Sequence, residues 1–320
     1  MSFKKNNLAV FSLMILLCFG SLDDAARAQS GNNFKLDPAR IFWTDLSFRA
    51  KNFWVEVSTD VQLRSLSASK LANVLPVSPR GNPIKPLATE AAEMTIHTTI
   101  EPKFRSAVSI DNRIWFDPTN GSALGRIRLR RGEDDFKKIY RFTRQGVFRH
   151  RIEPKNKKEA SLEPENWTDI KDFFYPYELA AQKCTSVTEP SLLIYIISTA
   201  AIAQLDNQLW LCAFGKRQLH GVQLRPQGFE RLEVSYLEKK SNRSRQQKRQ
   251  IQALKIALTS NPMESVLNDA ENFSFFGFHT DIALYIDPTY GLPLRVSGSI
   301  PAFGKAHLEL REVNLRMHTD

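Results

Sequence analysis

Residues Tyr285 to Leu310 read YIDPTYGLPLRVSGSIPAFGKAHLEL, and this stretch decides the fold. Apolar and polar side chains alternate before the Asp-Pro turn, after it, and again after Gly304. A period of two is typical of β-strands with one buried face, and Asp, Pro and Gly between such runs mark turns. Pro293 is tolerated at the start of a strand, and glycine suits the hairpin position at Gly304. The stretch therefore predicts a strand, a turn and a β-hairpin of an antiparallel sheet.

The same alternation extends toward the N-terminus. In EMTIHTTIE, residues 93–101, Met94, Ile96 and Ile100 fall on one side. RIRLRR, residues 126–131, places the arginines at its first, third and fifth positions on one face. The hairpin KKIYRFTRQGVFRHRI, residues 137–152, carries arginines and lysines that we expect to coat a solvent face. We predict an antiparallel sheet with one dry and one wet side.

One segment breaks the β pattern. Thr188 suits a helix N-cap, Pro190 suits a first helical turn, and residues 192–203 are apolar nearly all round. A helix with no polar face is buried, and this one is too short to cross a membrane. We therefore predict a mainly β protein with one buried apolar helix.

The first residues resemble a secretory signal. Lys4 and Lys5 precede the apolar run LAVFSLMILLCF, residues 8–19, and ARAQS follows with small residues at Ala26 and Ala28. This pattern predicts a signal peptide over residues 1–28, cleaved after Ala28, and a periplasmic location. We expect no integral membrane span after cleavage; an uncleaved N-terminal anchor is the alternative.

Residues 29–320 are expected to form a single large β-rich domain, since all-β folds of this size often form one. Four prolines between residues 76 and 86 indicate a Pro-rich excursion over residues 65–90. A hydrophilic basic loop is predicted at residues 239–250, with a solvated hairpin tip as the alternative. The surface basic residues there are Lys239, Lys240, Arg243, Arg245, Lys248 and Arg249.

The charge and cysteine content limit the partners. The formal net charge is +10, which in an exported protein favours anionic envelope components such as lipid head groups, whereas nucleic acid is not an expected partner outside the cytoplasm. Solubility alone is the alternative reading of this charge. Cys184 and Cys212 form either a disulfide, which an oxidising compartment permits, or two buried thiols.

The chain offers few reactive groups. It has no G-x-S-x-G elbow, P-loop or HExxH motif. We considered a metal site at His279, Asp281 and His307, and a thiol nucleophile at Cys212 with His220, and assigned neither because no tight His/Cys cluster is present. We expect no catalytic residue, no cofactor and no metal, and so no enzyme.

The C-terminal motifs carry a resemblance. SFFGFHTDIALYIDP and LPLRVSGSIPAFGKAHLELREVNL, with the apolar helix after Pro190, are similar to the signature of an uncharacterised family of exported bacterial envelope proteins. That family looks related in fold to the LolA-type lipoprotein carriers, and the likeness covers roughly residues 167–315. The resemblance implies a curved antiparallel sheet, an incomplete barrel, with helices over its concave side and an acyl-chain site beneath them. The Pro-rich excursion and the basic loop have no counterpart in it.

From this we expect binding or carriage of a lipid, an acyl chain or a lipoprotein in envelope biogenesis. The predicted apolar cavity is lined by helix residues and by aromatic residues of NFSFFGFHT, and ordinary core packing is the alternative for all of them. The residues are Leu192, Leu193, Ile194, Ile196, Ile197, Phe273, Phe275, Phe276 and Phe278. A structural or interaction module with a filled core and a basic surface is the second hypothesis, and a hydrolase the third.

Overall fold

The computed structural model of the chain describes residues 36–51, 53–86, 90–177, 184–200, 209–263, 273–301 and 304–316. The predicted signal peptide, residues 1–28, lies outside the described residues, as do residues 201–203 of the predicted helix. The predicted mainly β fold is confirmed: one large curved sheet, not a closed barrel, carries few helices.

The strands are β1 (Trp43–Lys51), β2 (Val55–Ser67), β3 (Glu90–Pro102), β4 (Val108–Phe116), β5 (Ala123–Arg131), β6 (Phe136–Phe142), β7 (Gly146–Glu153), β8 (Asp169–Pro176), β9 (Val187–Thr188), β10 (Leu209–Phe214), β11 (Leu219–Lys240), β12 (Arg243–Pro262), β13 (Thr280–Asp287), β14 (Leu292–Ile300) and β15 (Gly304–Leu315). The described helices are α2 (Ala68–Val74), α3 (Lys157–Ala160) and α4 (Leu193–Thr199), with 3-10 turns η1 (Pro38–Arg40), η2 (Pro164–Asn166) and η4 (Pro190–Leu192).

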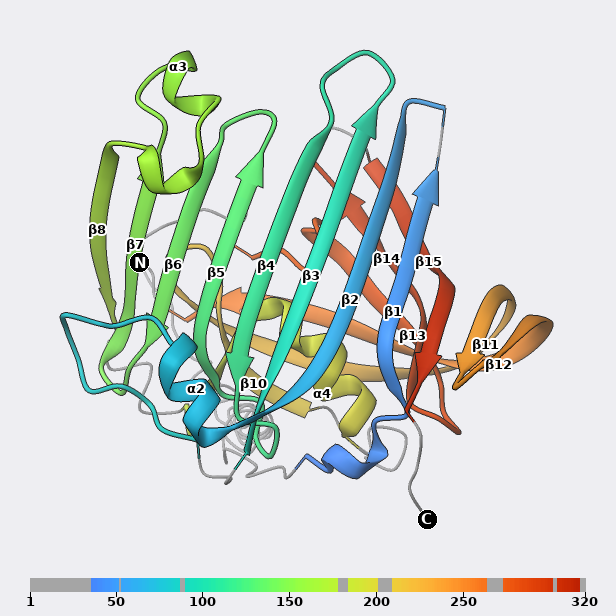
Figure 1. Cartoon of the computed structure of the whole chain (residues 1–320). Coiled ribbons are helices and arrows are strands. Elements are labelled where there is room, and N and C mark those ends of the chain that lie inside the picture. The colour runs from blue at the N-terminus through green and yellow to red at the C-terminus, as the bar shows by residue number, and fades with distance from the viewer. Residues whose placement is uncertain are drawn as a thin grey trace, which may run out of the picture.

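The described strands form one sheet in the order β8-β7-β6-β5-β4-β3-β2-β1-β15-β14-β13-β12-β11-β10-β9. Its pairs are antiparallel except β9 with β10 and β11 with β15. Because Leu237 of β11 pairs with Glu312 of β15, strands β11 to β15 form a ring, and β1 to β8 continue from it as an open wall. Figure 1 shows this wall in front, with β11 to β13 crossing behind it.

Helix α4 fills part of the hollow between the wall and the ring. Its seven residues are all buried, and they share one hydrophobic core with side chains from both parts. Tyr195 donates a hydrogen bond to the Pro118 carbonyl at 2.8 Å, and Trp43 Nε1 donates to Ser198 Oγ at 3.3 Å. The predicted buried helix is therefore present. None of the helices in the described ranges has the length and hydropathy that a bilayer crossing requires.

The turn in the stretch quoted first allows this packing. Gly291 has a φ of +58°, and a Cβ atom at this position would lie 2.6 Å from the carbonyl oxygen of Ser198 in α4. Glycine is the residue that tolerates both the left-handed backbone and the close approach. The turn between β13 and β14 can therefore lie directly against the helix.

Cys184 and Cys212 form a disulfide with a Cα–Cα distance of 5.8 Å. Cys184 precedes β9 and Cys212 lies in β10, so the bond closes a loop that contains η4 and α4. The disulfide thus ties the end of the sheet to the helix segment that fills the hollow.

The two predicted irregular segments are more ordered than expected. Within residues 65–90, β2 continues to Ser67 and α2 follows, packing Leu71 against Trp115 and Leu124 on the outer face of the wall. Residues 239–250 form the tip of the β11–β12 hairpin, so the expected alternative of a hairpin tip is the one present. Two of the six basic residues there are in ion pairs, Lys239 with Glu312 and Arg249 with Asp287.

Candidate functional site

The inward face of the wall is apolar on β2 and β3. The pairing register sets Val57 opposite Ile100 and Val61 opposite Ile96, with Asn112 of β4 next to Ile96. The side chains of Val57 and Ile100 are only half-buried, although they face the interior of the molecule. An apolar surface therefore faces an open space here.

The same face is basic on β5 to β7. Arg128 of β5 lies directly opposite Lys138 of β6, and Lys138 lies directly opposite Arg151 of β7. We call Arg128, Lys138 and Arg151 the basic row. Arg126 and Arg130 lie two residues away from Arg128 on either side along β5 and share its face. Like charges directly opposite each other in a sheet repel, so this arrangement is destabilising without a counter-charge.

The prediction that the basic side chains of residues 137–152 coat a solvent face is wrong for three of them. Arg141 is 7% exposed and donates a hydrogen bond to the Ile84 carbonyl, whereas Lys138 and Arg149, on the opposite face, are 8% and 3% exposed. The wall curls, so the face that carries Lys138 and Arg149 turns toward the hollow. Strand alternation fixes which side chains share a face, but the curvature decides which face is enclosed.

A cavity of about 1150 Å³ lies between these surfaces. Its wall combines the apolar surface of β2 to β4, the basic row, the start of η4 and the turn between β10 and β11. Eleven lysine and arginine side chains line it against six carboxylates, so the cavity is strongly positive. The cationic side chains are Arg49, Lys51, Arg126, Arg128, Arg130, Lys138, Arg151, Lys216, Arg217, Lys305 and Arg311.

Two carboxylates partly neutralise the basic half. Glu189 Oε1 accepts a hydrogen bond from Arg126 Nη1 at 2.6 Å, and both side chains are buried. Glu153 accepts a hydrogen bond from Arg151. Among the described residues, no carboxylate lies within ion-pair distance of Arg128 or Lys138. The basic row is therefore short of negative charge.

Aromatic rings provide the remaining contacts of these cations. The Lys138 ammonium lies 3.7 Å from the centre of the Phe136 ring, and the Arg126 guanidinium lies 4.3 Å from that of Tyr140. Cation–π contacts of this kind are worth about 0.5 to 2 kcal/mol each. They hold the side chains in place but supply no counter-charge.

The protonation of the row reflects this environment. Burial, together with the charges of Arg151, Arg128, Arg149 and Arg126, lowers the pKa of Lys138 to about 6. Burial, followed by the charge of Arg126, lowers the pKa of Arg128 to about 10. Arg128 is enclosed by protein yet retains solvent contact, since part of its surface faces the cavity. At pH 7 Arg128 therefore remains a cation, whereas Lys138 is largely neutral in the empty protein.

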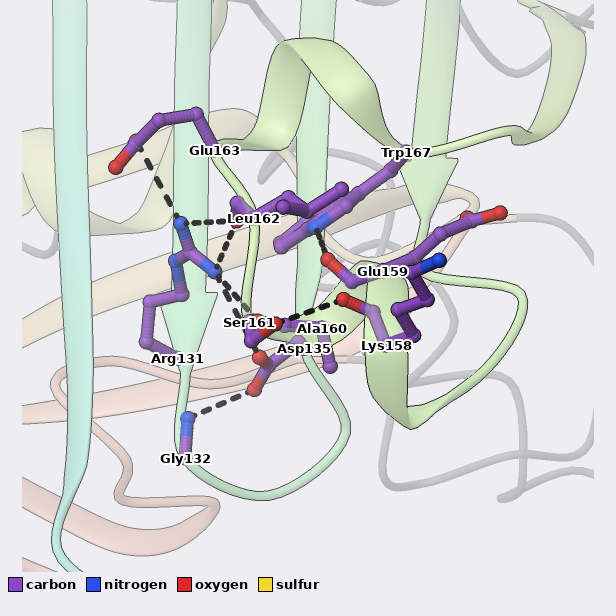
Figure 2. A network of polar contacts seen from close by, with 10 residues as sticks. All are labelled: Arg131, Gly132, Asp135, Lys158, Glu159, Ala160, Ser161, Leu162, Glu163 and Trp167. Atoms are coloured by element: carbon purple, nitrogen blue, oxygen red, sulfur yellow. Dashed lines mark hydrogen bonds and ion pairs between the residues drawn. The ribbon is translucent and has the colours of Figure 1, made fainter.

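The segment that contains α3 and η2 is held against the end of β5 by Arg131, whose side chain points to the outer face (Figure 2). Its guanidinium donates to the carbonyls of Ala160 and Leu162 at 3.1 Å and lies 4.8 Å from the Trp167 ring centre. Trp167 Nε1 donates to the Glu159 carbonyl at 2.8 Å. The segment from α3 to β8 is thereby fixed to the end of β5, next to the cavity residues Asp134 and Pro154.

Of the nine predicted cavity residues, Phe276 lines this cavity and the other eight do not. The helix side chains and Phe273, Phe275 and Phe278 are fully buried in the hydrophobic core. Their positions agree with the alternative of ordinary core packing. The cavity begins beside η4, where Glu189, Pro190 and Ser191 line it, so α4 fills the hollow next to the cavity rather than covering it.

The fold separates the side chains of the two other candidate sites. Cys212 is in the disulfide, and His220 is buried beside the Phe273 ring at 5.4 Å. His279 and His307 line the cavity, whereas Asp281 accepts a hydrogen bond from Ser299. Within the described ranges, no three His, Cys, Asp or Glu side chains converge as a metal site would require.

Sequence reasoning missed the basic row and Glu189. The available signal was the alternation of RIRLRR, which places three arginines on one face of a strand whose other face is apolar. A second signal was Glu189 beside Pro190, because an acidic residue before a short helical turn caps it. Glu189, and not the predicted Thr188, is the N-cap of η4, where its side chain accepts a hydrogen bond from the Ser191 N–H.

No protein-family model matches the sequence, and no curated protein matches it either. Among solved structures, a crystal structure of a beta-barrel-like protein of domain of unknown function DUF1849 from Brucella abortus is similar. The match has 7% sequence identity and a TM-score of 0.44, and it covers 87% of this chain and 99% of that chain. A likeness at this level carries no conclusion about family or function.

Proposed function

We propose that the protein is a non-enzymatic binding protein of the periplasm that holds an amphiphile with an acyl chain, as part of envelope biogenesis. The single observation that carries the proposal is the apolar wall of the cavity, where the side chains of Val57, Ile100 and Ile110 face open space. Such a wall gains about 0.8 kcal/mol for each methylene group of a ligand that it removes from water. A lipid or the acyl chain of a lipoprotein is also what the resemblance to the lipoprotein carriers implies.

The size and shape of the cavity support this class of ligand. Its volume of about 1150 Å³ is slightly larger than that of most small-molecule sites, which measure roughly 300 to 1000 Å³. An elongated ligand with one or two chains matches such a volume better than a compact metabolite does.

Exposed aromatic rings lie at the ends of the strands that form the apolar wall. Phe53 and Trp54 precede β2, and Phe104 follows β3, with exposures of 68%, 58% and 75%. Lys103 lies over the Phe53 ring at 3.9 Å. Aromatic rings with neighbouring lysines are enriched where proteins meet the lipid–water interface, which is where an acyl-chain ligand would be taken up.

The test is binding of a neutral amphiphile, monododecanoyl glycerol, measured by isothermal titration calorimetry below its critical micelle concentration. Ile100→Asn places a polar amide on the apolar wall and is expected to weaken binding about tenfold. The matched control is Thr99→Asn, which makes the adjacent substitution on the outer face and should bind like the wild type. Native mass spectrometry of protein purified without detergent should also show a co-purified lipid.

The proposal is overturned if the wild type binds no monododecanoyl glycerol and carries no lipid. It is also overturned if both variants bind equally well, because the ligand would then not contact the inward face of β3.

A further inference from the structure

The basic row costs stability in the empty protein. Three basic side chains are directly opposed on three successive strands, and the side chain of Lys138, which has no carboxylate partner among the described residues, is only 8% exposed. Buried charges without partners are among the most costly groups in a fold, and apolar side chains of similar volume are usually more stable in their place. The row therefore indicates a site whose missing negative charge comes from a ligand.

The charge balance indicates how much negative charge is missing. Arg126 is paired with Glu189 and Arg151 with Glu153, which leaves Arg128 and Lys138 of the basic row, and also Arg130 and Arg149 on the same face, without a carboxylate among the described residues. Protonated Lys138 and Arg128 together carry two positive charges. A phosphate monoester carries about 1.5 to 2 negative charges at pH 7, whereas a carboxylate carries one.

The side chains of the row also suit phosphate. Guanidinium groups donate two parallel hydrogen bonds to phosphate oxygens, and an ammonium group binds phosphate as a point charge. In the row, two guanidinium groups flank one ammonium group, and adjacent strands are about 4.8 Å apart. All three can therefore converge on one tetrahedral anion from neighbouring strands.

The polarity changes along a single line across the sheet. The register connects Ile96, Asn112, Arg128, Lys138 and Arg151 from β3 to β7, so that an apolar residue is followed by an amide and then by three cations. An amphiphile that lies along this line places its chain on β2 and β3 and its head group on β5 to β7.

The geometry points to a phosphate ester as the head group of the bound amphiphile, with the phosphate held by Arg128, Lys138 and Arg151 and the chain on the apolar wall. This inference rests on the proposed function, because it specifies the ligand of the same cavity. The shared chemistry is a phosphate group, which could come from a phospholipid or from free phosphate, and the experiment separates the two.

The test compares three probes on the full-length chain at pH 7 by isothermal titration calorimetry: dodecyl phosphate, monododecanoyl glycerol and inorganic phosphate. Dodecyl phosphate is expected to bind at least tenfold more tightly than monododecanoyl glycerol, and at least a hundredfold more tightly than inorganic phosphate. Arg128→Gln should reduce the preference for dodecyl phosphate to threefold or less, because it weakens binding of dodecyl phosphate far more than binding of monododecanoyl glycerol.

Lys138→Gln is the second variant and should have the same effect, while Arg243→Gln, at the hairpin tip, is the matched control and should retain the full preference. Binding of the neutral probe that is retained by a variant shows that the variant is folded.

The outcomes are distinct. Equal binding of the two amphiphiles by the wild type, or a preference that persists in both variants, overturns the phosphate assignment and leaves the proposed function standing. If inorganic phosphate binds as tightly as dodecyl phosphate, the inference that the phosphate belongs to an amphiphile is overturned. A wild type that binds neither amphiphile overturns the proposed function itself.

Discussion

Arg126 donates a hydrogen bond to Glu189 at a distance of 2.6 Å. This buried ion pair joins the wall of the sheet to the helical segment that fills the hollow. The other carboxylate oxygen of Glu189 accepts from the backbone N–H of Ser191 at 2.8 Å, at the start of the 3-10 turn that leads into α4. One side chain thus neutralises a cation of β5 and caps the helical segment. The position of α4 and the charge of the cavity depend on the same residue.

Glu189→Gln should destabilise the protein strongly. The substitution keeps an oxygen that can cap η4 but removes the negative charge beside Arg126, and breaking a buried ion pair in this way costs about 3 to 5 kcal/mol. Urea unfolding monitored by tryptophan fluorescence measures the loss. Glu230→Gln, in an exposed pair with Lys255, is the control and should leave the urea midpoint close to that of the wild type.

The double variant Arg126→Leu with Glu189→Leu separates charge from packing. Replacing both partners by apolar residues is often neutral or stabilising, so it should recover most of the stability that Glu189→Gln loses. A Glu189→Gln variant as stable as the wild type would show that Arg126 reaches water in the cavity and does not need the carboxylate.

The disulfide should contribute substantially to stability. The sequence separation of Cys184 and Cys212 is 28, and closing a loop of that length in the unfolded chain is worth roughly 3 to 4 kcal/mol. The serine double variant at these positions should lose that amount in urea unfolding, and the wild type should show the same loss in dithiothreitol. Identical midpoints with and without reductant would count against this contribution.

The local sequence predicted the strands and the helix better than it predicted the site. The alternation in YIDPTYGLPLRVSGSI corresponds to β13 and β14, and the apolar segment after Pro190 is the buried helix. Both follow from contacts within a few residues, since periodicity reports which side chains share a face.

The cavity was not predictable because it depends on long-range pairing. Whether Lys138 faces water or the hollow is decided by how β1 joins β15 and how β11 returns to β15, contacts between segments far apart in the chain. For the same reason Leu193 and Phe273 were assigned to a cavity although they pack against other core side chains. Hydrophobicity alone does not separate a filled core from a lined pocket.

His220 should make the protein sensitive to acid. Burial lowers the pKa of this histidine to about 4, against about 6.5 in an unfolded chain, so the unfolded state binds more protons between these values and stability falls as the pH is lowered from 6.5 to 4. The full effect is about 3 kcal/mol. In urea unfolding at pH 7 and pH 4, His220→Leu should therefore gain stability relative to the wild type at the lower pH.

Val222→Ala is the control for this measurement, because it removes buried apolar volume from the same strand and no proton-binding group. Its difference in stability from the wild type should be the same at both pH values. The prediction fails if the His220→Leu difference is equally constant.

Lys138 should make stability rise with pH in a higher pH range than His220 does. Its pKa is lowered to about 6 in the folded protein, whereas the ordinary value is 10.5, so between these values the unfolded state binds one more proton and stability rises with pH. Relative to Lys138→Met, the wild type should gain up to about 1.4 kcal/mol per pH unit between pH 6.5 and 8.5. Besides burial, the charged groups that lower the pKa of Lys138 are Arg151 and Arg149 on β7 and Arg128 and Arg126 on β5.

Ile139→Met is the control for Lys138, since it introduces the same side chain at the next residue of β6, on the opposite face, and should show no pH-dependent difference from the wild type. Saturating dodecyl phosphate should flatten the slope of the wild type, because a bound anion beside Lys138 favours its protonated form and raises its pKa. A slope that is absent without ligand would mean that Lys138 is hydrated in the cavity and already carries its charge. A slope that survives saturation would mean that the anion binds elsewhere.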